Sequence, residues 1–220
     1  MHASAAERVQ SGGDTTRLSL GRCSPFAKRL IDLCGAAALL TFSFPVIVVF
    51  ACLIKLQDGG PVFHRRRVVG PGGLFDAFKL RSMRVDADAV LDRDARLREA
   101  YSVNFKLKDD PRVTTVGAVM RRYSIDELPQ LWNVLRGQMS LVGPRMISPA
   151  ELEKFGDAAW IFSHVKPGIT GDWQIRGNHE AGYAERVRME LWYVERRSLA
   201  LDLAILLRTP LRVLRGAGEH

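Results

Sequence analysis

Two adjacent carboxylates, Asp126 and Glu127, closely follow a pair of arginines, Arg121 and Arg122, in a chain of 220 residues. A carboxylate can act as a metal ligand or as a covalent nucleophile, and neighbouring arginines would neutralise an anionic substrate. Glu127 also stands three residues after Ser124, which is the spacing of a helix-capping box with Ser124 as the N-cap. The local pattern therefore leaves a catalytic pair and a helix cap equally open.

The composition is that of a basic, folded chain. Hydrophobic residues make up 47% and charged residues 25%, which excludes a disordered chain and a multi-span membrane protein. The formal net charge of +8 indicates an anionic partner, which could be nucleic acid, anionic lipid or a phosphorylated substrate. The cysteines, Cys23, Cys34 and Cys52, lack the spacing of a zinc site or a disulfide framework, and we interpret them as buried, reduced thiols.

A long apolar segment at residues 30–54 must be placed before the site can be understood. Its length of about 25 residues is enough to cross a bilayer core as a helix and too long for the apolar part of a signal peptide. Basic residues lie on both sides of it, whereas positive charge marks only the cytoplasmic end of a spanning helix. Pro45 near its middle would bend a helix. A spanning helix and a re-entrant helix, which returns to the side it entered, both remain open.

A polar residue and a polar tail accompany this segment. Asp32 lies near its start and is expected to pair with a base such as Arg29 or to lie among lipid headgroups. Residues 1–25 are rich in small and polar residues without periodicity, which predicts a disordered tail.

The remaining chain predicts short strands and several helices. Residues 62–64 and 74–80 flank a Gly-Pro-Gly-Gly turn and predict a β-hairpin. Lys79 and Arg81 would share one face of its second strand, which could hold a phosphate or simply be solvated. Further elements are expected as a charged helix at 86–100, a helix from about 115, a helix around 131–135, an extended segment at 139–145, a turn and strand at 165–176, and helices at 183–197 and 199–214. The last is apolar and carries arginines, so it suits either a membrane interface or the core.

Four motifs occur in one order along the chain: DPRVT at 110–114, SIDELPQLWNVLRG at 124–137, MSLVGPR at 139–145 and KPGITG at 166–171. They resemble the bacterial sugar transferases, which are monotopic phosphoglycosyl transferases, also called polyprenyl-phosphate hexose-1-phosphate transferases. The resemblance runs from about Phe26 to the end of the chain.

The resemblance implies a reaction and a site. Family members move a sugar-1-phosphate from a UDP-sugar to undecaprenyl (polyprenyl) phosphate and release UMP, which begins an exopolysaccharide, a capsule or an O-antigen. By similarity, Asp126 is the nucleophile that forms a covalent phospho-sugar intermediate, and Glu127, with Asp126, holds Mg²⁺. The candidate phosphate or substrate contacts are Arg121, Arg145, Lys79, Arg81, Gln174 and Arg176. For Gln174 and Arg176, a solvated strand face remains the alternative.

The resemblance also implies a location and a fold. The expected organisation is a disordered tail at 1–25, a re-entrant membrane helix at 26–57 that bends at Pro45, and a catalytic domain at 58–216 on the cytoplasmic face of the bacterial inner membrane. The expected fold is α+β and mostly helical, with a small β-hairpin and amphipathic interfacial helices around the site. A homodimer is compatible with this organisation, and we expect the minimal form of the family, without further spanning helices.

Several positions depart from the usual family pattern, and other functions stay in competition. Asp172, Asn178 and Glu190 lie around the expected donor pocket, and Glu190 stands where the family often has Asp. These departures leave the identity of the donor sugar open.

The competing hypotheses are a membrane-anchored basic protein that binds anionic lipid or nucleic acid without catalysis, and a catalytically silent scaffold. The sequence contains no nucleic-acid-binding motif, so we expect no nucleic-acid partner.

Overall fold

The computed structural model describes residues 24–105, 107, 109–176 and 182–215. Its α-helices are α2 (Pro25–Asp58), α3 (Ala87–Arg93), α4 (Ala95–Asn104), α5 (Thr115–Arg122), α6 (Gln130–Leu135), α7 (Pro149–Leu152), α8 (Ile161–His164), α9 (Asp172–Arg176), α10 (Tyr183–Arg196) and α11 (Leu199–Leu214). The 3₁₀ segments are η1 (Ile125–Glu127) and η2 (Glu153–Trp160), and the strands are β1 (Phe63–Gly70), β2 (Gly73–Leu80), β3 (Ser140–Val142) and β4 (Gly168–Thr170). The predicted class, α+β and mostly helical, is confirmed, whereas the prediction for residues 1–25 falls almost entirely outside the described residues.

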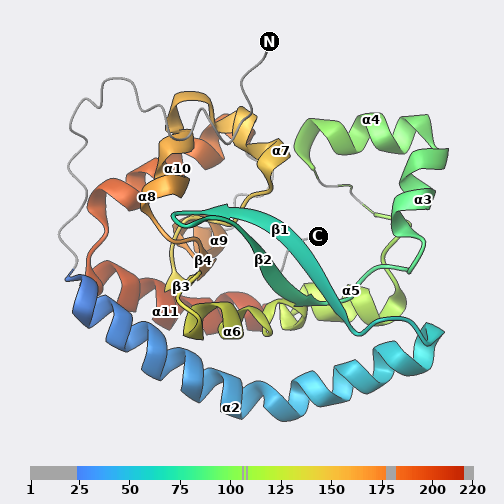
Figure 1. Cartoon of the computed structure of the whole chain (residues 1–220), viewed down its shortest axis with the longest axis horizontal. Coiled ribbons are helices and arrows are strands. Elements are labelled where there is room, and N and C mark those ends of the chain that lie inside the picture. The colour runs from blue at the N-terminus through green and yellow to red at the C-terminus, as the bar shows by residue number, and fades with distance from the viewer. Residues whose placement is uncertain (1–23, 106, 108, 177–181, 216–220) are drawn as a thin grey trace.

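Helix α2 forms one edge of the molecule, and the other elements lie on its concave side (Figure 1). Its start is fixed by Pro25 in the first turn and by the Ser24 hydroxyl, which accepts a hydrogen bond from the backbone N–H of Ala27. Its end is fixed by Gly59, which adopts a left-handed conformation with φ of 69°. The helix stays continuous through Pro45 and curves along its length.

Polar contacts near the start of α2 include the expected basic partner of Asp32. Asp32 is buried and accepts hydrogen bonds from Ser140 Oγ and Leu141 N, each at 3.0 Å, and its basic partner is Lys28 at 3.2 Å. The expected pairing of Asp32 with a nearby base is therefore confirmed, with Lys28 as the partner instead of Arg29. Arg29 is occupied elsewhere, because it donates to backbone carbonyls at the end of α6.

The outer side of α2 is apolar and exposed. Phe42 and Leu56 are each 82% exposed, and Phe44 is 60% exposed. Cys34 and Cys52 are also exposed, so the interpretation of these two as buried thiols is wrong. That interpretation assumed that the apolar residues of this segment pack inside the protein. In the structure, many of them lie on the exposed outer side of the helix.

The sheets are small, and the hairpin is confirmed with a longer first strand than predicted. Strands β1 and β2 pair antiparallel, and His64 lies opposite Lys79. Strands β3 and β4 pair in parallel. Between these sheets and helices α6, α8 and α10 lies the main hydrophobic core, whose fully buried members include Val68, Ala77, Met139, Phe162 and Val194.

Two predicted elements differ in type or extent. The strand predicted at 165–176 is confirmed only at Gly168–Thr170, because the chain then turns at Gly171 and continues as helix α9. A Cβ at Gly171 would lie 2.4 Å from the Gly143 carbonyl oxygen, so the backbone passes too close for a side chain. The charged helix predicted at 86–100 is divided into α3 and α4 by Asp94, whose carboxylate caps α4.

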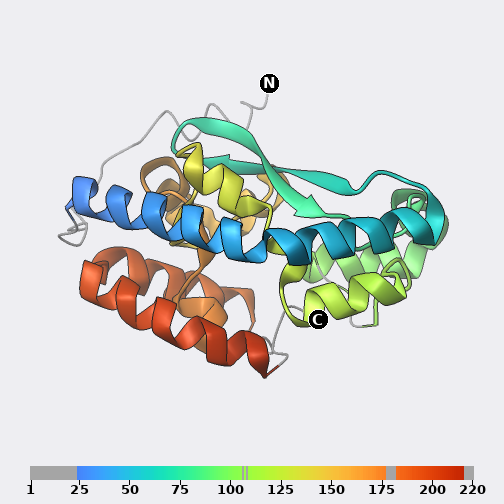
Figure 2. The same ribbon diagram turned by 90° about the horizontal axis from the view of Figure 1, so that it is seen from below.

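Helix α11 runs beside the first half of α2, and Lys28 of α2 pairs with Asp202 of α11 at 2.9 Å. In Figure 2, α2 has the hairpin along one side and α11 along the other. The side of α11 that bears Asp202 and Ile205 is buried, whereas Leu207 and Leu214 are 77% and 75% exposed. This exposed leucine row agrees with the interfacial alternative for the last helix better than with the core alternative.

Candidate active site

Asp126 and Glu127 lie in η1, a single turn between α5 and α6, and not at the start of an α-helix. Ser124 has a φ of 53°, and its side chain makes no capping hydrogen bond within the described part of the chain. The predicted capping box is therefore wrong. Two features explain the difference, since the left-handed Ser124 turns its hydroxyl away from N-cap geometry and Pro129 delays the α-helix until Gln130. The turn directs both carboxylates towards β2 and the segment after β3.

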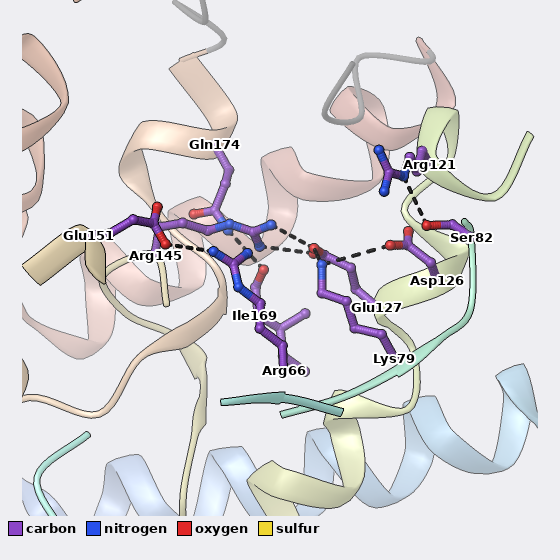
Figure 3. A network of polar contacts seen from close by, with 10 residues as sticks. All are labelled: Arg66, Lys79, Ser82, Arg121, Asp126, Glu127, Arg145, Glu151, Ile169 and Gln174. Carbon is purple, nitrogen blue, oxygen red and sulfur yellow. Dashed lines mark hydrogen bonds and ion pairs between the residues drawn. The ribbon is translucent and has the colours of Figure 1, made fainter. Parts of the chain in front are cut away.

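Glu127 is held by two basic residues from different parts of the fold (Figure 3). The Arg145 guanidinium donates to both carboxylate oxygens, with distances of 3.0 Å and 2.6 Å. Lys79 Nζ, from β2, donates to Glu127 Oε1 at 2.7 Å. Arg145 and Glu127 are both buried, so this charge-assisted arrangement fixes the Glu127 side chain strongly.

Asp126 is buried but less tightly paired. Among the described residues it forms a long ion pair with Lys79, whose Nζ lies 3.7 Å from Oδ2. Burial raises the pKa of Asp126, and the neighbouring negative charge of Glu127 adds to the rise, while Lys79, Arg121 and Arg145 oppose it. Of the two carboxylates, Asp126 therefore has the side chain that is freer to react.

Two more predicted residues lie at this cluster. Arg121, at the end of α5, donates from Nε to Ser82 Oγ at 2.9 Å and lies on the side of Asp126 away from Glu127 (Figure 3). Gln174, on α9, donates to the Ile169 carbonyl at 2.9 Å and lies beside Arg145. The structure thus brings Lys79, Arg121 and Arg145 to the carboxylate pair, and it places Gln174 beside Arg145.

The other two predicted contacts have different partners. The Arg81 guanidinium binds the Asp58 carboxylate at 2.5 Å and 2.6 Å and the Pro61 carbonyl at 2.6 Å, so it joins the end of α2 to the hairpin. Arg81 follows the last residue of β2, and its side chain does not continue the alternation that placed it beside Lys79. Arg176 pairs with Asp172 at 2.7 Å and lies over the Trp192 ring. The expectation that these two side chains contact the site is therefore not met, because the guanidinium groups of Arg81 and Arg176 pair with Asp58 and Asp172.

Sequence reasoning missed two neighbours of the site, Arg66 and Ser82. Arg66 of β1 lies on the same face as Lys79, two residues from its cross-strand partner, and pairs with Glu151 at 2.6 Å. Strand alternation along 64–66 could have indicated Arg66. Ser82 contacts Arg121 through folding alone, and no local sequence signal marks it. Glu190, which was expected near the donor pocket, accepts a hydrogen bond from the Arg145 backbone. Asn178, which was expected near the donor pocket, lies outside the described residues.

The carboxylate pair is the only expected ligand set for Mg²⁺, and its chemistry fits. Mg²⁺ prefers hard oxygen ligands and is usually bound by one or two carboxylates together with substrate phosphates and water. Among the described residues, no group of three or more His, Cys, Asp or Glu side chains could hold a metal. If Mg²⁺ binds at this pair, Asp126 is the less occupied of the two carboxylates.

The comparisons with known proteins agree with these motifs. The family model described as "Bacterial sugar transferase" matches residues 23–216. The chain belongs to the bacterial sugar transferase family. It is 43% identical over 202 residues to the UDP-galactose-lipid carrier transferase of Erwinia amylovora, which covers 90% of this chain and 42% of that protein.

Two further relatives differ in length. The exopolysaccharide production protein ExoY of Rhizobium meliloti is 41% identical over 199 residues, which is 88% of each protein. The undecaprenyl-phosphate galactose phosphotransferase of Salmonella typhimurium is 41% identical over 204 residues, covering 90% of this chain and 43% of that protein. The chain thus spans less than half the length of the Erwinia and Salmonella relatives.

Proposed function

We propose that this sugar transferase moves a sugar-1-phosphate from a UDP-sugar to undecaprenyl phosphate and releases UMP. The observation that carries the proposal is the difference between the two buried carboxylates. Glu127 is fixed by Arg145 and Lys79, whereas Asp126 beside it is only loosely paired. A site with one fixed and one free carboxylate among cations suits nucleophilic attack on a diphosphate.

The first step is an attack by an Asp126 carboxylate oxygen on the phosphorus that bears the sugar. A bond forms between this oxygen and phosphorus, and the bond from phosphorus to the bridging oxygen breaks, so that UMP leaves with the bonding electron pair. In the second step, a phosphate oxygen of the acceptor attacks the same phosphorus. The aspartyl–phosphorus bond breaks, the Asp126 carboxylate is regenerated, and the product is a polyprenyl diphosphate-linked sugar.

The surrounding cations offset the electrostatic repulsion between the nucleophile and the substrate. A carboxylate repels a diphosphate, and negative charge develops on the leaving UMP. Lys79 lies within reach of both carboxylates, while Arg121 and Arg145 approach from opposite sides of Asp126. When bound, Mg²⁺ would neutralise further phosphate charge. These residues hold the donor in line with Asp126 and offset the repulsion.

We also propose that α2 is re-entrant and sits in the cytoplasmic leaflet of the bacterial inner membrane. Both ends of the helix bond to the same folded body: Arg29 donates to the Val134 and Leu135 carbonyls, and Asp58 pairs with Arg81. A helix that crossed the bilayer would place these two anchors on opposite sides. The exposed apolar outer surface of α2 would then lie in lipid, with the basic flanks on the cytoplasmic side.

The test is UMP release from a panel of UDP-sugars by the full chain with Mg²⁺ and undecaprenyl phosphate. We expect turnover with one or a few donors and loss of at least about 10³-fold in Asp126→Asn. Glu127→Gln should retain more activity, because it leaves the nucleophile in place. Wild-type turnover in Asp126→Asn would contradict the assignment of the nucleophile, and no release from any UDP-sugar would contradict the proposed reaction.

A further inference from the structure

Glu190 is a buried acid that the proposed reaction does not use. It lies on α10 with 1% of its surface exposed, and its Oε1 accepts a hydrogen bond from the backbone N–H of Arg145 at 2.9 Å. Its other oxygen, Oε2, is buried and has no hydrogen-bond partner among the described residues. Burying an incompletely paired carboxyl group is costly, so simple packing would be better served by an apolar side chain.

A short chain of contacts leads from Glu190 to the nucleophile. Glu190 fixes the backbone of Arg145, and a β-bridge between Arg145 and Gly168 supports the same segment. The guanidinium of Arg145 then holds both oxygens of Glu127, which is adjacent to Asp126. A shift of the Arg145 backbone would therefore move the group that fixes Glu127 and faces the donor diphosphate.

We propose that Glu190 is a positioning residue for the transfer reaction, because it holds the Arg145 backbone at the place from which the guanidinium reaches Glu127. This inference rests on the proposed function. It adds a residue outside the carboxylate cluster that acts on the reaction through Arg145. The hydrogen-bond acceptor at position 190, and not its negative charge, is what the positioning requires.

The charges around Glu190 predict how donor binding changes with pH. Arg186 of α10, Arg145 after β3 and Asp172 of α9 act on it, and the packed surface of η2 is apolar, since its charged residues are exposed. Burial raises the pKa of Glu190 to about 7, with Asp172 adding to the rise and Arg186 and Arg145 opposing it. Above that pH, the group adds a negative charge next to Arg145, which weakens the attraction of the site for a diphosphate.

The experiment compares three variants of the full chain by their UMP release at several pH values. Glu190→Gln keeps an oxygen acceptor without the charge, whereas Glu190→Leu removes the acceptor. Tyr193→Phe is the matched control, because it removes a buried hydroxyl on the same helix, one that donates to Asp202 and to the Val142 carbonyl. Thermal unfolding of each variant shows whether it is folded under the assay conditions.

For Glu190→Leu, we expect kcat to fall roughly 10- to 100-fold, since displaced catalytic groups lose orientation, while Tyr193→Phe keeps the wild-type kcat. Glu190→Gln should keep kcat and remove a pH effect. The wild-type KM for the donor should rise several-fold from about pH 6 to about pH 8.5, because the ionised carboxylate adds a negative charge beside Arg145. Wild-type kcat in Glu190→Leu, or a kcat in Glu190→Gln as low as that of Glu190→Leu, overturns the proposal while leaving the proposed function intact. A wild-type chain inactive with every UDP-sugar refutes the proposed function, and the positioning role with it.

Discussion

Arg145 is predicted to be the residue on which the geometry of the carboxylate pair depends most. Its guanidinium is buried and holds both oxygens of Glu127, so Arg145→Met removes this pair while Lys79 still pairs with Glu127. Breaking a buried pair by removing one partner costs about 3–5 kcal/mol. Because Lys79 still compensates part of the charge, we expect the lower end, about 3 kcal/mol of unfolding free energy.

A double-mutant cycle separates this pairing from lost packing. In the Arg145→Met background, Glu127→Gln removes the stranded charge and should restore about 2 kcal/mol, whereas alone it should destabilise the protein. Denaturant unfolding of the four proteins in one detergent, followed by tryptophan fluorescence, measures the coupling. A coupling below about 0.5 kcal/mol, the additivity limit for independent sites, would refute the view that Arg145 fixes Glu127.

Three further predictions concern stability. Burial raises the pKa of Asp126, so at pH values above the ordinary Asp pKa the ionised carboxylate lowers the stability of the folded protein. Asp126→Asn should therefore melt at or above the wild-type temperature at about pH 8, and a lower melting temperature contradicts this. Because the pKa of Glu190 is raised to about 7, the stability of the wild-type protein falls as pH rises towards 7. Glu190→Gln should therefore gain about 3 kcal/mol of unfolding free energy over wild type at about pH 8 and little at about pH 4. An equal gain at both pH values contradicts this. Gly117→Ala places a Cβ 1.9 Å from the Ser82 carbonyl oxygen and should lower the melting temperature markedly, whereas Gly72→Ala, with open space around it, should not; similar melting of both variants contradicts the close approach.

Local patterns predicted much of the secondary structure because each element had its own signal. The hairpin is marked by a glycine-rich turn between apolar runs, and α5 begins at a threonine N-cap, Thr114, whose hydroxyl accepts from Gly117 N. The prediction of a capping box at Ser124 was wrong because the same residues are also compatible with a 3₁₀ turn. The backbone conformation of Ser124 determines which of the two forms, and residue spacing alone does not predict its φ angle.

The site was predictable in part, for a related reason. Lys79 points to the carboxylates because strand alternation holds through β2, whereas Arg81, just beyond the strand, reaches Asp58 across 23 positions of sequence. Arg176 was placed on a strand that ends at Thr170, so its direction was wrong. Contacts such as the one between Glu190 and Arg145 join segments 45 positions apart, and only the packed fold shows them.

The most direct test of the proposed reaction is the intact mass of the full chain after incubation with Mg²⁺ and its UDP-sugar, without undecaprenyl phosphate. A covalent intermediate predicts an added mass equal to one sugar-phosphate, located at Asp126 by peptide mapping, absent from Asp126→Asn and lost when the acceptor is added. Stoichiometric UMP release without any added mass on the wild-type protein, or an adduct on another residue, would contradict the account.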